Sequence, residues 1–212
     1  MLLGKARENV MTAMSRLESV FCRSVPWSAF ARRVVLPWAV QGSSVAGDVL
    51  ELGAGSGAMS QRILEGGAGV RLTAIDIDPS MVDRIENALA PYGASAVAGV
   101  GDATRLPFRD ASFDVVVSWL MLHHTIDWET AITEAARVLR PGGRLVGYDL
   151  VDTRTARLIH RLDGSEHRLF SPSALESALE SALDAATVAP AIRGLVCRFS
   201  ATARGSVRNG SA

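Results

Sequence analysis

The sequence predicts an α/β fold built around a mainly parallel sheet. From Asp48 onward, short apolar runs alternate with helical stretches, the pattern of parallel strands joined by crossover helices. The run VLELGAGSG at 49–57 leads from an apolar strand through a glycine-rich turn into a helix. Two closely spaced apolar runs near the end of the chain favour an antiparallel pair at one edge of the sheet.

Each element has its own signal in the chain. Apolar runs predict five strands, at 48–52, 71–76, 96–100, 113–119 and 144–150. Helices are expected between most of them, near 56–65, 79–90 and 128–139. Asp78, Asp127 and Ser171 each precede a helix and are predicted to cap it.

The last part of the chain predicts one more helix and two strands. Leu175, Leu179 and Leu183 share one helical face. The final strands are expected around 186–192 and 195–201, and the small polar residues from 202 to 212 predict a loose tail.

Two segments lie outside this alternation. Residues 1–41 predict a helical arm that lies on the main domain of 42–201, because apolar residues recur there at helical spacing. Residues 152–170 are polar and predict an irregular segment, a candidate substrate lid.

Composition excludes several classes of protein. The 212 residues carry 22 basic and 22 acidic side chains, and a formal charge of zero gives no net attraction to nucleic acid or to an anionic membrane. Two cysteines, Cys22 and Cys197, make neither a disulfide framework nor a cysteine metal cage. Charges at Lys5 and Arg7 interrupt the start of the chain, and no apolar stretch is long enough to cross a membrane, so we expect a cytoplasmic protein.

Glycines and acidic residues mark the expected ligand-binding edge of the sheet. Gly53, Gly55 and Gly57 permit a tight turn and the close approach of a ligand. Three acidic side chains, Glu51, Asp76 and Asp102, lie at or just beyond the ends of successive strands, which is where open α/β sheets bind ligands. Asp76 is placed to accept hydrogen bonds from both hydroxyls of a ribose.

The glycine turn alone fits two cofactors. GAGSGA at 53–58 also satisfies the dinucleotide pattern, with Ala58 as its last member. A charged Glu51 would repel the pyrophosphate of a nicotinamide cofactor by about 1 to 4 kcal/mol. The same charge would attract the sulfonium and ammonium groups of S-adenosylmethionine, so electrostatics favours the sulfonium cofactor.

Residues 48–151 resemble the class I S-adenosylmethionine-dependent methyltransferases that act on small molecules, quinones and lipids. ELGAGSG, AIDIDPSM, GDATRLPF and FDVVVSWLMLHH resemble that family's first four motifs, and EAARVLRPGGRLVGYD resembles its following helix and fifth strand. The resemblance implies a Rossmann-like, doubly wound sheet of seven strands in the order 3-2-1-4-5-7-6, with the last strand antiparallel and helices on both faces.

The resemblance also implies a role for individual residues toward S-adenosylmethionine. Gly53, Ala54, Gly55 and Gly57 would form the turn beside the methionine part, with Glu51 nearby. The ribose would be held by Asp76. Ile77 and Met81 would flank the adenine. Asp102 would accept a hydrogen bond from the adenine amino group, and the Ala103 amide would donate to a ring nitrogen. Ser118 and Trp119 would close the cleft beside the methyl group.

Methyl transfer needs a general base only when the acceptor loses a proton as it attacks. His123 and His124 follow the fourth strand and are candidate bases at neutral pH; packing or a backbone hydrogen bond is the alternative role. Asp149 and His167 are weaker candidates. The histidines lack the ligand spacing of a zinc site.

The acceptor is less defined by the sequence. SWLMLHH replaces the proline pair that follows the fourth strand in the branch that methylates DNA amino groups, so we expect a small organic acceptor and no nucleic acid. Trp27, Phe30 and Trp38 either roof an apolar or aromatic substrate or pack on the domain. A basic stretch over 154–168 either meets an anionic acceptor or faces solvent.

The prediction is therefore a methyltransferase for a small organic acceptor, with O-methylation favoured over C- or N-methylation and S-adenosylhomocysteine as product. Two alternatives remain: an NAD(P)-dependent oxidoreductase, for which a Tyr-x-x-x-Lys pair is missing, and a non-catalytic module that binds the sulfonium cofactor or its product. Monomer and homodimer are both compatible with the sequence.

Overall fold

The computed structural model describes residues 35–40, 44–67, 69–163 and 166–205. Most of the predicted arm, including Trp27 and Phe30, lies outside this range, as does the tail beyond residue 205. Within it, the short helix α3 (Leu36–Ala39) precedes the sheet.

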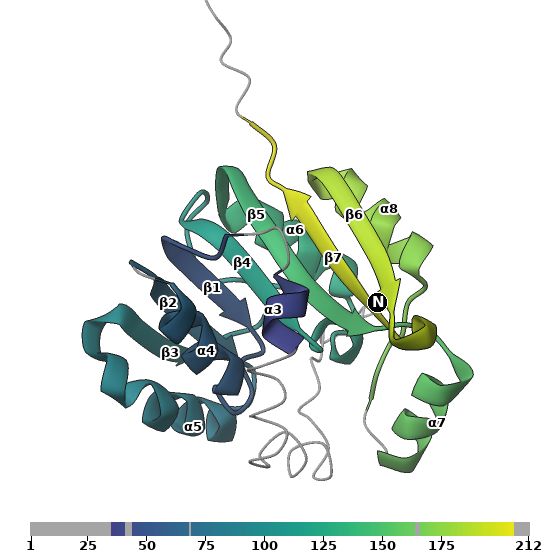
Figure 1. Cartoon of the computed structure of the whole chain (residues 1–212), viewed down its shortest axis with the longest axis horizontal. Coiled ribbons are helices and arrows are strands. Elements are labelled where there is room, and N and C mark those ends of the chain that lie inside the picture. The colour runs from purple at the N-terminus through teal and green to yellow at the C-terminus, as the bar shows by residue number, and fades with distance from the viewer. Residues whose placement is uncertain (1–34, 41–43, 68, 164–165, 206–212) are drawn as a thin grey trace, which may run out of the picture.

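Seven strands form one sheet in the order β3-β2-β1-β4-β5-β7-β6 (Figure 1). β1 to β5 are mutually parallel, and β7 is antiparallel to both β5 and β6. The strands are β1 (Asp48–Leu52), β2 (Arg71–Asp76), β3 (Ala96–Val100), β4 (Phe113–Trp119), β5 (Leu139–Leu150), β6 (Asp184–Ala191) and β7 (Val196–Thr202). The predicted order and the antiparallel last strand are confirmed.

Helices cover both faces of the sheet. On one face, α3, α4 and α5 contribute Ala39, Ile63 and Ile85 to a core cluster. On the other, α6 and α8 bury Ile132 and Leu179, and Figure 1 shows these two helices behind the strands. The longer helices are α4 (Ala58–Gly66), α5 (Pro79–Leu89), α6 (Trp128–Val138), α7 (Arg154–Asp163) and α8 (Pro172–Ala182). Short 3₁₀ segments lie at η2 (Ala90–Ser95), η3 (Leu122–His124) and η4 (Ile192–Gly194).

Burial explains why the central strands read as continuous apolar runs. Every residue of β1 after Asp48 is buried, and all of β4 except Asp114, because helices cover both faces of a parallel sheet. The edge strands β3 and β6 are only half-buried or exposed. Residues at the carboxyl ends of β1 and β4 are thus held on a rigid base.

The predicted strands agree closely with the structure, and two local predictions are wrong. β5 begins at Leu139, ahead of the predicted 144, because the Pro141-Gly142-Gly143 segment joins the strand through an irregular register with β4. Asp127 does not cap α6 through its side chain; it accepts a hydrogen bond from the Thr130 hydroxyl. Asp78 and Ser171 do cap α5 and α8.

The segment predicted to be irregular over 152–170 contains the helix α7. Its buried positions include Ala156 and His160, whereas Leu158 and Leu162 are exposed. The buried side chains described on this helix are thus one small and one polar residue, which gives little of the apolar periodicity that identifies a helix in a sequence. Within the described part of the chain, none of the helices has the length and apolar character needed to span a bilayer.

Candidate functional site

The glycine-rich turn bends sharply between β1 and α4. Gly53, Gly55 and Gly57 all have positive φ, at 65°, 56° and 76°, a conformation that favours glycine. A Cβ on Gly53 would lie 2.3 Å from Cγ of Met121, and one on Gly57 would lie 3.1 Å from Cβ of Ala88. The close approaches that need glycine here are thus to the protein's own side chains.

Asp76 connects this turn to the end of β2. Its Oδ2 accepts a hydrogen bond of 2.9 Å from the Gly55 amide, and its Oδ1 accepts one of 3.0 Å from the Asp78 amide. Burial raises the pKa of Asp76, although the two amide bonds act against that rise. A carboxylate accepts about four hydrogen bonds, so both oxygens retain capacity for ligand hydroxyls.

Asp102 lies just beyond the end of β3, beside the end of β2 that carries Asp76. The Gly101 amide donates a 3.0 Å hydrogen bond to the Asp76 carbonyl, which brings Asp102 to the same edge of the sheet. Asp102 Oδ1 accepts from both the amide and the hydroxyl of Thr104, at 2.8 and 2.7 Å. Ala103 is buried, and so is Met81 in the first turn of α5. Ile77, which follows Asp76 in the sequence, is half-buried.

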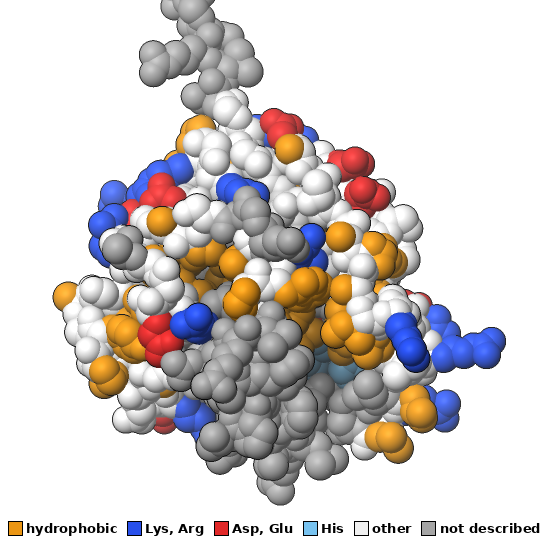
Figure 2. All heavy atoms as spheres, viewed as in Figure 1, with side chains coloured by type: hydrophobic (Ala, Val, Ile, Leu, Met, Phe, Trp, Pro, Cys, Tyr) orange, Lys and Arg blue, Asp and Glu red, His pale blue; other side chains and the backbone are white. Residues whose placement is uncertain are grey.

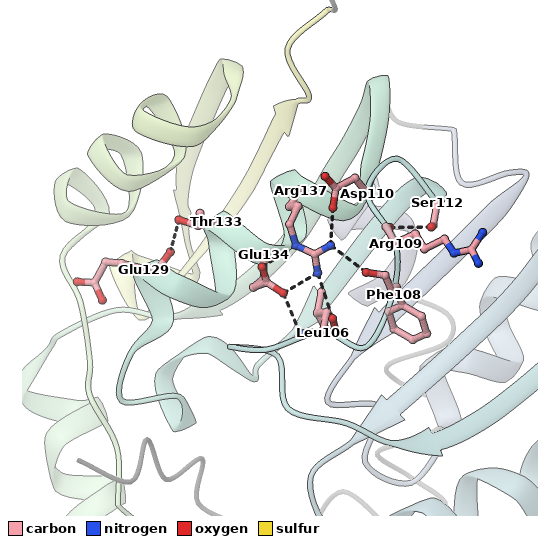
Figure 3. Close-up of polar contacts among 9 residues, drawn as sticks. All are labelled: Leu106, Phe108, Arg109, Asp110, Ser112, Glu129, Thr133, Glu134 and Arg137. Carbon is pink, nitrogen blue, oxygen red and sulfur yellow. Dashed lines mark hydrogen bonds and ion pairs between the residues drawn. The ribbon is translucent and has the colours of Figure 1, made fainter. Parts of the chain in front are cut away.

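Arg137 on α6 fixes the loop that follows Asp102 (Figure 3). Its guanidinium donates to the carbonyl oxygens of Leu106 and Phe108 at 3.1 and 2.8 Å and to Asp110 at 2.7 Å. Glu134 pairs with the same guanidinium at 2.7 Å and accepts from the Leu106 amide. These hydrogen bonds, chiefly those to Glu134, raise the pKa of Arg137 above its usual range. The loop is therefore held to a buried helix.

Glu51 is fully buried on β1, where its Oε2 accepts a hydrogen bond from the Ser60 hydroxyl. Burial raises its pKa to about 8, and the nearby charge of Asp76 adds to the rise. At neutral pH Glu51 is therefore largely protonated in the cofactor-free chain. A negative charge at this position is therefore favoured when a cation lies nearby to stabilise it.

Three buried polar atoms without a hydrogen-bond partner among the described residues lie around this end of the sheet. They are Glu51 Oε1, Ser118 Oγ and Trp119 Nε1. Glu51 pairs with Val117 and Leu52 pairs with Ser118 across the β1–β4 ladder, so Glu51 and Trp119 lie on one face of the sheet and Ser118 lies on the other. Trp119 interacts with the Glu51 carboxyl group and opposes the rise in its pKa, so these two buried groups are close enough to contact one polar ligand. The residues present fit a small molecule with cationic and hydroxyl groups.

His123 and Asp149 form a buried pair between η3 and β5. His123 Nδ1 hydrogen-bonds Asp149 Oδ1, and Asp149 Oδ2 accepts from the Leu122 amide at 2.7 Å. Burial, with the nearby charge of Asp149, raises the pKa of Cys197 to about 12, so its thiol stays protonated. The pairing was not predicted, although Trp119 and Tyr148 are register partners, His123 follows the end of β4, and Asp149 is the residue before the last of β5.

His124, His160 and His167 gather around the same pair. His123 and His124 have ring centroids 4.0 Å apart, and His160 lies 5.1 Å from His123. His160 was expected only as part of a basic stretch, and its place in this cluster was missed. In the part of the chain that the structure describes, no set of three His, Cys, Asp or Glu side chains has an arrangement that would hold a metal ion.

The structure addresses only part of the two expectations about the acceptor, which concern the aromatic residues before β1 and the basic stretch over 154–168. Trp38 packs edge-on against Tyr148 at 5.7 Å and under Arg198 at 5.8 Å, which is packing on the domain. The stretch over 154–168 is not a free basic face, because Arg157 pairs with Asp152 and Arg168 with Glu129. Figure 2 shows hydrophobic side chains gathered beside α3 and the lower parts of β5 and β7, with histidine visible next to them.

Comparison with known proteins agrees with this arrangement. Residues 50–147 match a family model described as a methyltransferase domain. An uncharacterised methyltransferase of Mycobacterium tuberculosis is 42% identical over 100 residues, which are 46% of this chain and 37% of that protein. The demethylmenaquinone methyltransferase of Mycolicibacterium paratuberculosis is 41% identical over 101 residues, 45% of this chain and 43% of that one. The chain thus matches less than half the length of these relatives.

The similarity extends to solved structures. One is a Thermotoga maritima S-adenosylmethionine-dependent methyltransferase described as a possible histamine N-methyltransferase, which superposes with a TM-score of 0.69 at 19% identity and covers 89% of this chain and 97% of that one. At this identity the likeness concerns the fold. Together with the family model over 50–147 and the motif residues at the ends of β1 to β4, this shared fold supports the resemblance of the chain to class I S-adenosylmethionine-dependent methyltransferases.

Proposed function

We propose that the chain transfers a methyl group from S-adenosylmethionine to a hydroxyl of a small organic acceptor. The observation that carries this proposal is that Glu51, Asp76 and Trp119 lie at the carboxyl ends of the three adjacent strands β1, β2 and β4, where the buried Glu51 carboxyl group interacts with both Asp76 and Trp119. In open α/β sheets this edge binds ligands.

The residues suit the parts of the proposed cofactor. Asp76 has capacity for the two ribose hydroxyls, and the Gly53-Ala54-Gly55 turn runs beside it. Ile77 and Met81 are proposed to flank the adenine, with Asp102 as an acceptor for its amino group and the Ala103 amide as a donor to a ring nitrogen. Gly57 would contribute indirectly, because its lack of a side chain allows the start of α4 to pack closely on α5.

Glu51 suits a positively charged methyl donor in particular. A nearby cation favours the ionised form of a buried carboxyl group. Binding of the sulfonium cofactor would therefore favour loss of the Glu51 proton. The pyrophosphate of a dinucleotide is negatively charged, so it would not stabilise the ionised form of Glu51. When bound, S-adenosylmethionine supplies a methyl group on a sulfonium, and its transfer leaves S-adenosylhomocysteine.

The His123–Asp149 pair supports a hydroxyl acceptor. With Asp149 ionised, the proton of the His123 ring resides on Nδ1 and is donated to Asp149, which leaves Nε2 with a free electron pair. Nε2 then accepts the proton that the hydroxyl releases as its oxygen takes the methyl group. Asp149 holds the tautomer and stabilises the imidazolium, and His124 is the neighbouring alternative base.

The acceptor is proposed to be apolar outside its reacting hydroxyl. Two relatives are named for O-methylation, a 27-O-demethylrifamycin SV methyltransferase of Amycolatopsis mediterranei and a malonyl-[acyl-carrier protein] O-methyltransferase of Hahella chejuensis. Hydrophobic side chains lie next to the histidines on the surface in Figure 2.

The test is methyl transfer from labelled S-adenosylmethionine to a panel of small phenols, aliphatic alcohols and amines, with neutral and anionic members of matched size. We expect label in neutral hydroxyl compounds and none with Asp149→Asn under the same conditions. Label that appears only in amines or at carbon would contradict O-methylation, and binding of S-adenosylmethionine without transfer to any acceptor would favour a non-catalytic module.

A further inference from the structure

A row of side chains crosses the sheet near the carboxyl ends of β4 and β5. Trp119 of β4 and Tyr148 of β5 are register partners, and Tyr148 is also the register partner of Arg198 on β7. Register partners on neighbouring strands project from the same face of a sheet. Trp119 and Tyr148 belong to the core cluster to which α3, α4 and α5 contribute, so this is the face that those helices cover. Within the sheet, Tyr148 is thus flanked by Trp119 and Arg198.

Tyr148 lies in contact with two indole rings. It is buried, and its ring centroid is 5.6 Å from that of Trp119 and 5.7 Å from that of Trp38. The Tyr148 and Trp119 rings are inclined at 33°, whereas Trp38 meets Tyr148 edge-on at 64°. Both arrangements are favourable for aromatic pairs. Because protein interiors are closely packed, Tyr148 occupies space into which the Trp119 ring would otherwise move.

Arg198 holds α3 over this pair of rings. Its Nη1 donates a 3.0 Å hydrogen bond to the Trp38 carbonyl, and its guanidinium lies 5.8 Å from the centroid of the Trp38 ring. Ala39 of the same helix is buried in the core cluster. Figure 1 shows α3 in front of the sheet, toward the carboxyl end of β1. Trp38 therefore covers Tyr148 and is itself bound by a residue of β7.

Trp119 also interacts with the buried Glu51 carboxyl group of β1. Two other side chains act on this carboxyl group: the Ser60 hydroxyl of α4 donates a hydrogen bond to it, and Asp76 at the end of β2 acts through its charge. The interaction with Trp119 lowers the pKa of Glu51, and the charge of Asp76 raises it. The placement of one indole ring therefore influences the ionisation of Glu51.

We propose that Tyr148 is a positioning residue of the candidate cofactor site. Its ring packs against Trp119 and holds the indole beside Glu51, and Trp38 of α3 keeps the Tyr148 ring in place. The importance of this contact for S-adenosylmethionine rests on the proposed function, whereas the positioning of the indole does not.

The indole N–H resonance of Trp119 tests the positioning without any ligand. In the wild type this resonance should move with pH as Glu51 ionises, with a midpoint at about pH 8. The carboxyl-carbon resonance of Glu51 reports the same midpoint directly.

Two substitutions at Tyr148 separate the ring from the hydroxyl group. Tyr148→Leu removes the ring, so the Trp119 resonance should lose most of its response to pH. The Glu51 midpoint should rise in this variant, because an interaction that favours the ionised form is lost. Tyr148→Phe keeps the ring and should match the wild type. Retention of the indole response or of the midpoint in Tyr148→Leu would overturn the proposal, and so would a Tyr148→Phe variant that behaves as Tyr148→Leu does.

Two further variants distinguish positioning from a general loss of packing. Phe113→Leu removes a buried ring from the opposite end of β4 and should leave both resonances as in the wild type. Trp38→Leu removes a half-buried ring from α3 and leaves the sheet unaltered, so it tests the proposal even if Tyr148→Leu does not fold. It should raise the Glu51 midpoint by less than Tyr148→Leu does. An unchanged midpoint in Trp38→Leu would contradict the proposal.

Titration calorimetry with S-adenosylhomocysteine tests what the contact contributes to the cofactor site. Tyr148→Leu should weaken binding by about threefold to tenfold, whereas Tyr148→Phe and Phe113→Leu should bind as the wild type does. Equal affinity in Tyr148→Leu and the wild type would overturn the role of Tyr148 in this site. If the wild type itself does not bind S-adenosylhomocysteine, the proposed function fails, and the resonance measurements still decide whether Tyr148 positions the indole.

Discussion

The Gly55 amide donates a 2.9 Å hydrogen bond to Asp76 Oδ2, which joins the turn after β1 to the end of β2. The same carboxylate is the proposed ribose ligand. Asp76 therefore has a role in the structure of the turn and a proposed role in binding, and the two are separable by experiment.

Asp76→Asn should weaken the binding of S-adenosylhomocysteine by at least about tenfold, because a charged acceptor of hydroxyl hydrogen bonds is lost. Stability should fall by only about 1 kcal/mol, since the amide retains one oxygen for the turn. Titration calorimetry and urea unfolding measure the two effects. Asp83→Asn, at an exposed position on α5, is the control for both. Reduced stability with unchanged affinity would make Asp76 purely structural.

Glu51 should make the free energy of unfolding depend on pH. Its pKa is about 8 in the folded chain and near the ordinary glutamate value when unfolded. Between pH 5 and pH 8 the folded state keeps a proton that the unfolded state releases, so stability falls as pH rises, by up to about 1.4 kcal/mol per pH unit.

Glu51→Gln removes the titrating group. The free energy of unfolding of this variant minus that of the wild type should therefore increase from pH 5 to pH 8. Denaturant unfolding at several pH values measures the difference. Glu86→Gln, at an exposed position on α5, should parallel the wild type over the same range. Parallel curves for Glu51→Gln and the wild type would show that Glu51 is ionised in the folded chain.

Much of this fold was predictable because its signals are local. The bounds of β1, β2, β3 and β4 agree with the apolar runs in the sequence, since central parallel strands are buried on both faces. α7 was not predictable in this way, because the buried side chains described on it are an alanine and a histidine. The positions of the strand ends in the sequence predicted which residues lie at the edge of the site. The pKa of Glu51 depends on how deeply it is buried and on the nearby Asp76, and only the packed structure shows these.

Arg137 should stabilise the loop that carries Asp102. Arg137→Met removes its hydrogen bonds to the carbonyls of Leu106 and Phe108 and to Asp110. Because the side chain is 31% exposed, we expect a loss of about 1 to 2 kcal/mol of stability, with faster amide exchange in 102–112. Arg109→Gln is the control, since Arg109 extends away from this network in Figure 3, and should change stability by less than about 0.5 kcal/mol. Unchanged exchange in Arg137→Met would refute the role.

Asp149→Asn should separate chemistry from cofactor binding. Loss of the carboxylate that orients His123 should lower kcat for a hydroxyl acceptor by about 10² to 10³, with the Kd for S-adenosylhomocysteine within about twofold of the wild type. Single-turnover transfer and calorimetry measure these quantities, again with Asp83→Asn as control. An equal loss of binding and rate would indicate that Asp149 supports the fold of the site as a whole.

The central claim is that the edge formed by β1, β2 and β4 binds an adenosine-containing sulfonium cofactor. The most direct measurement is the shift in melting temperature caused by S-adenosylhomocysteine and by NADH, each at about a hundred times the Kd expected of a true ligand. S-adenosylhomocysteine should raise the melting temperature by roughly 5 to 10 °C, equivalent to about 2.7 kcal/mol, and NADH should leave it unchanged. A shift with NADH and none with S-adenosylhomocysteine would contradict the claim.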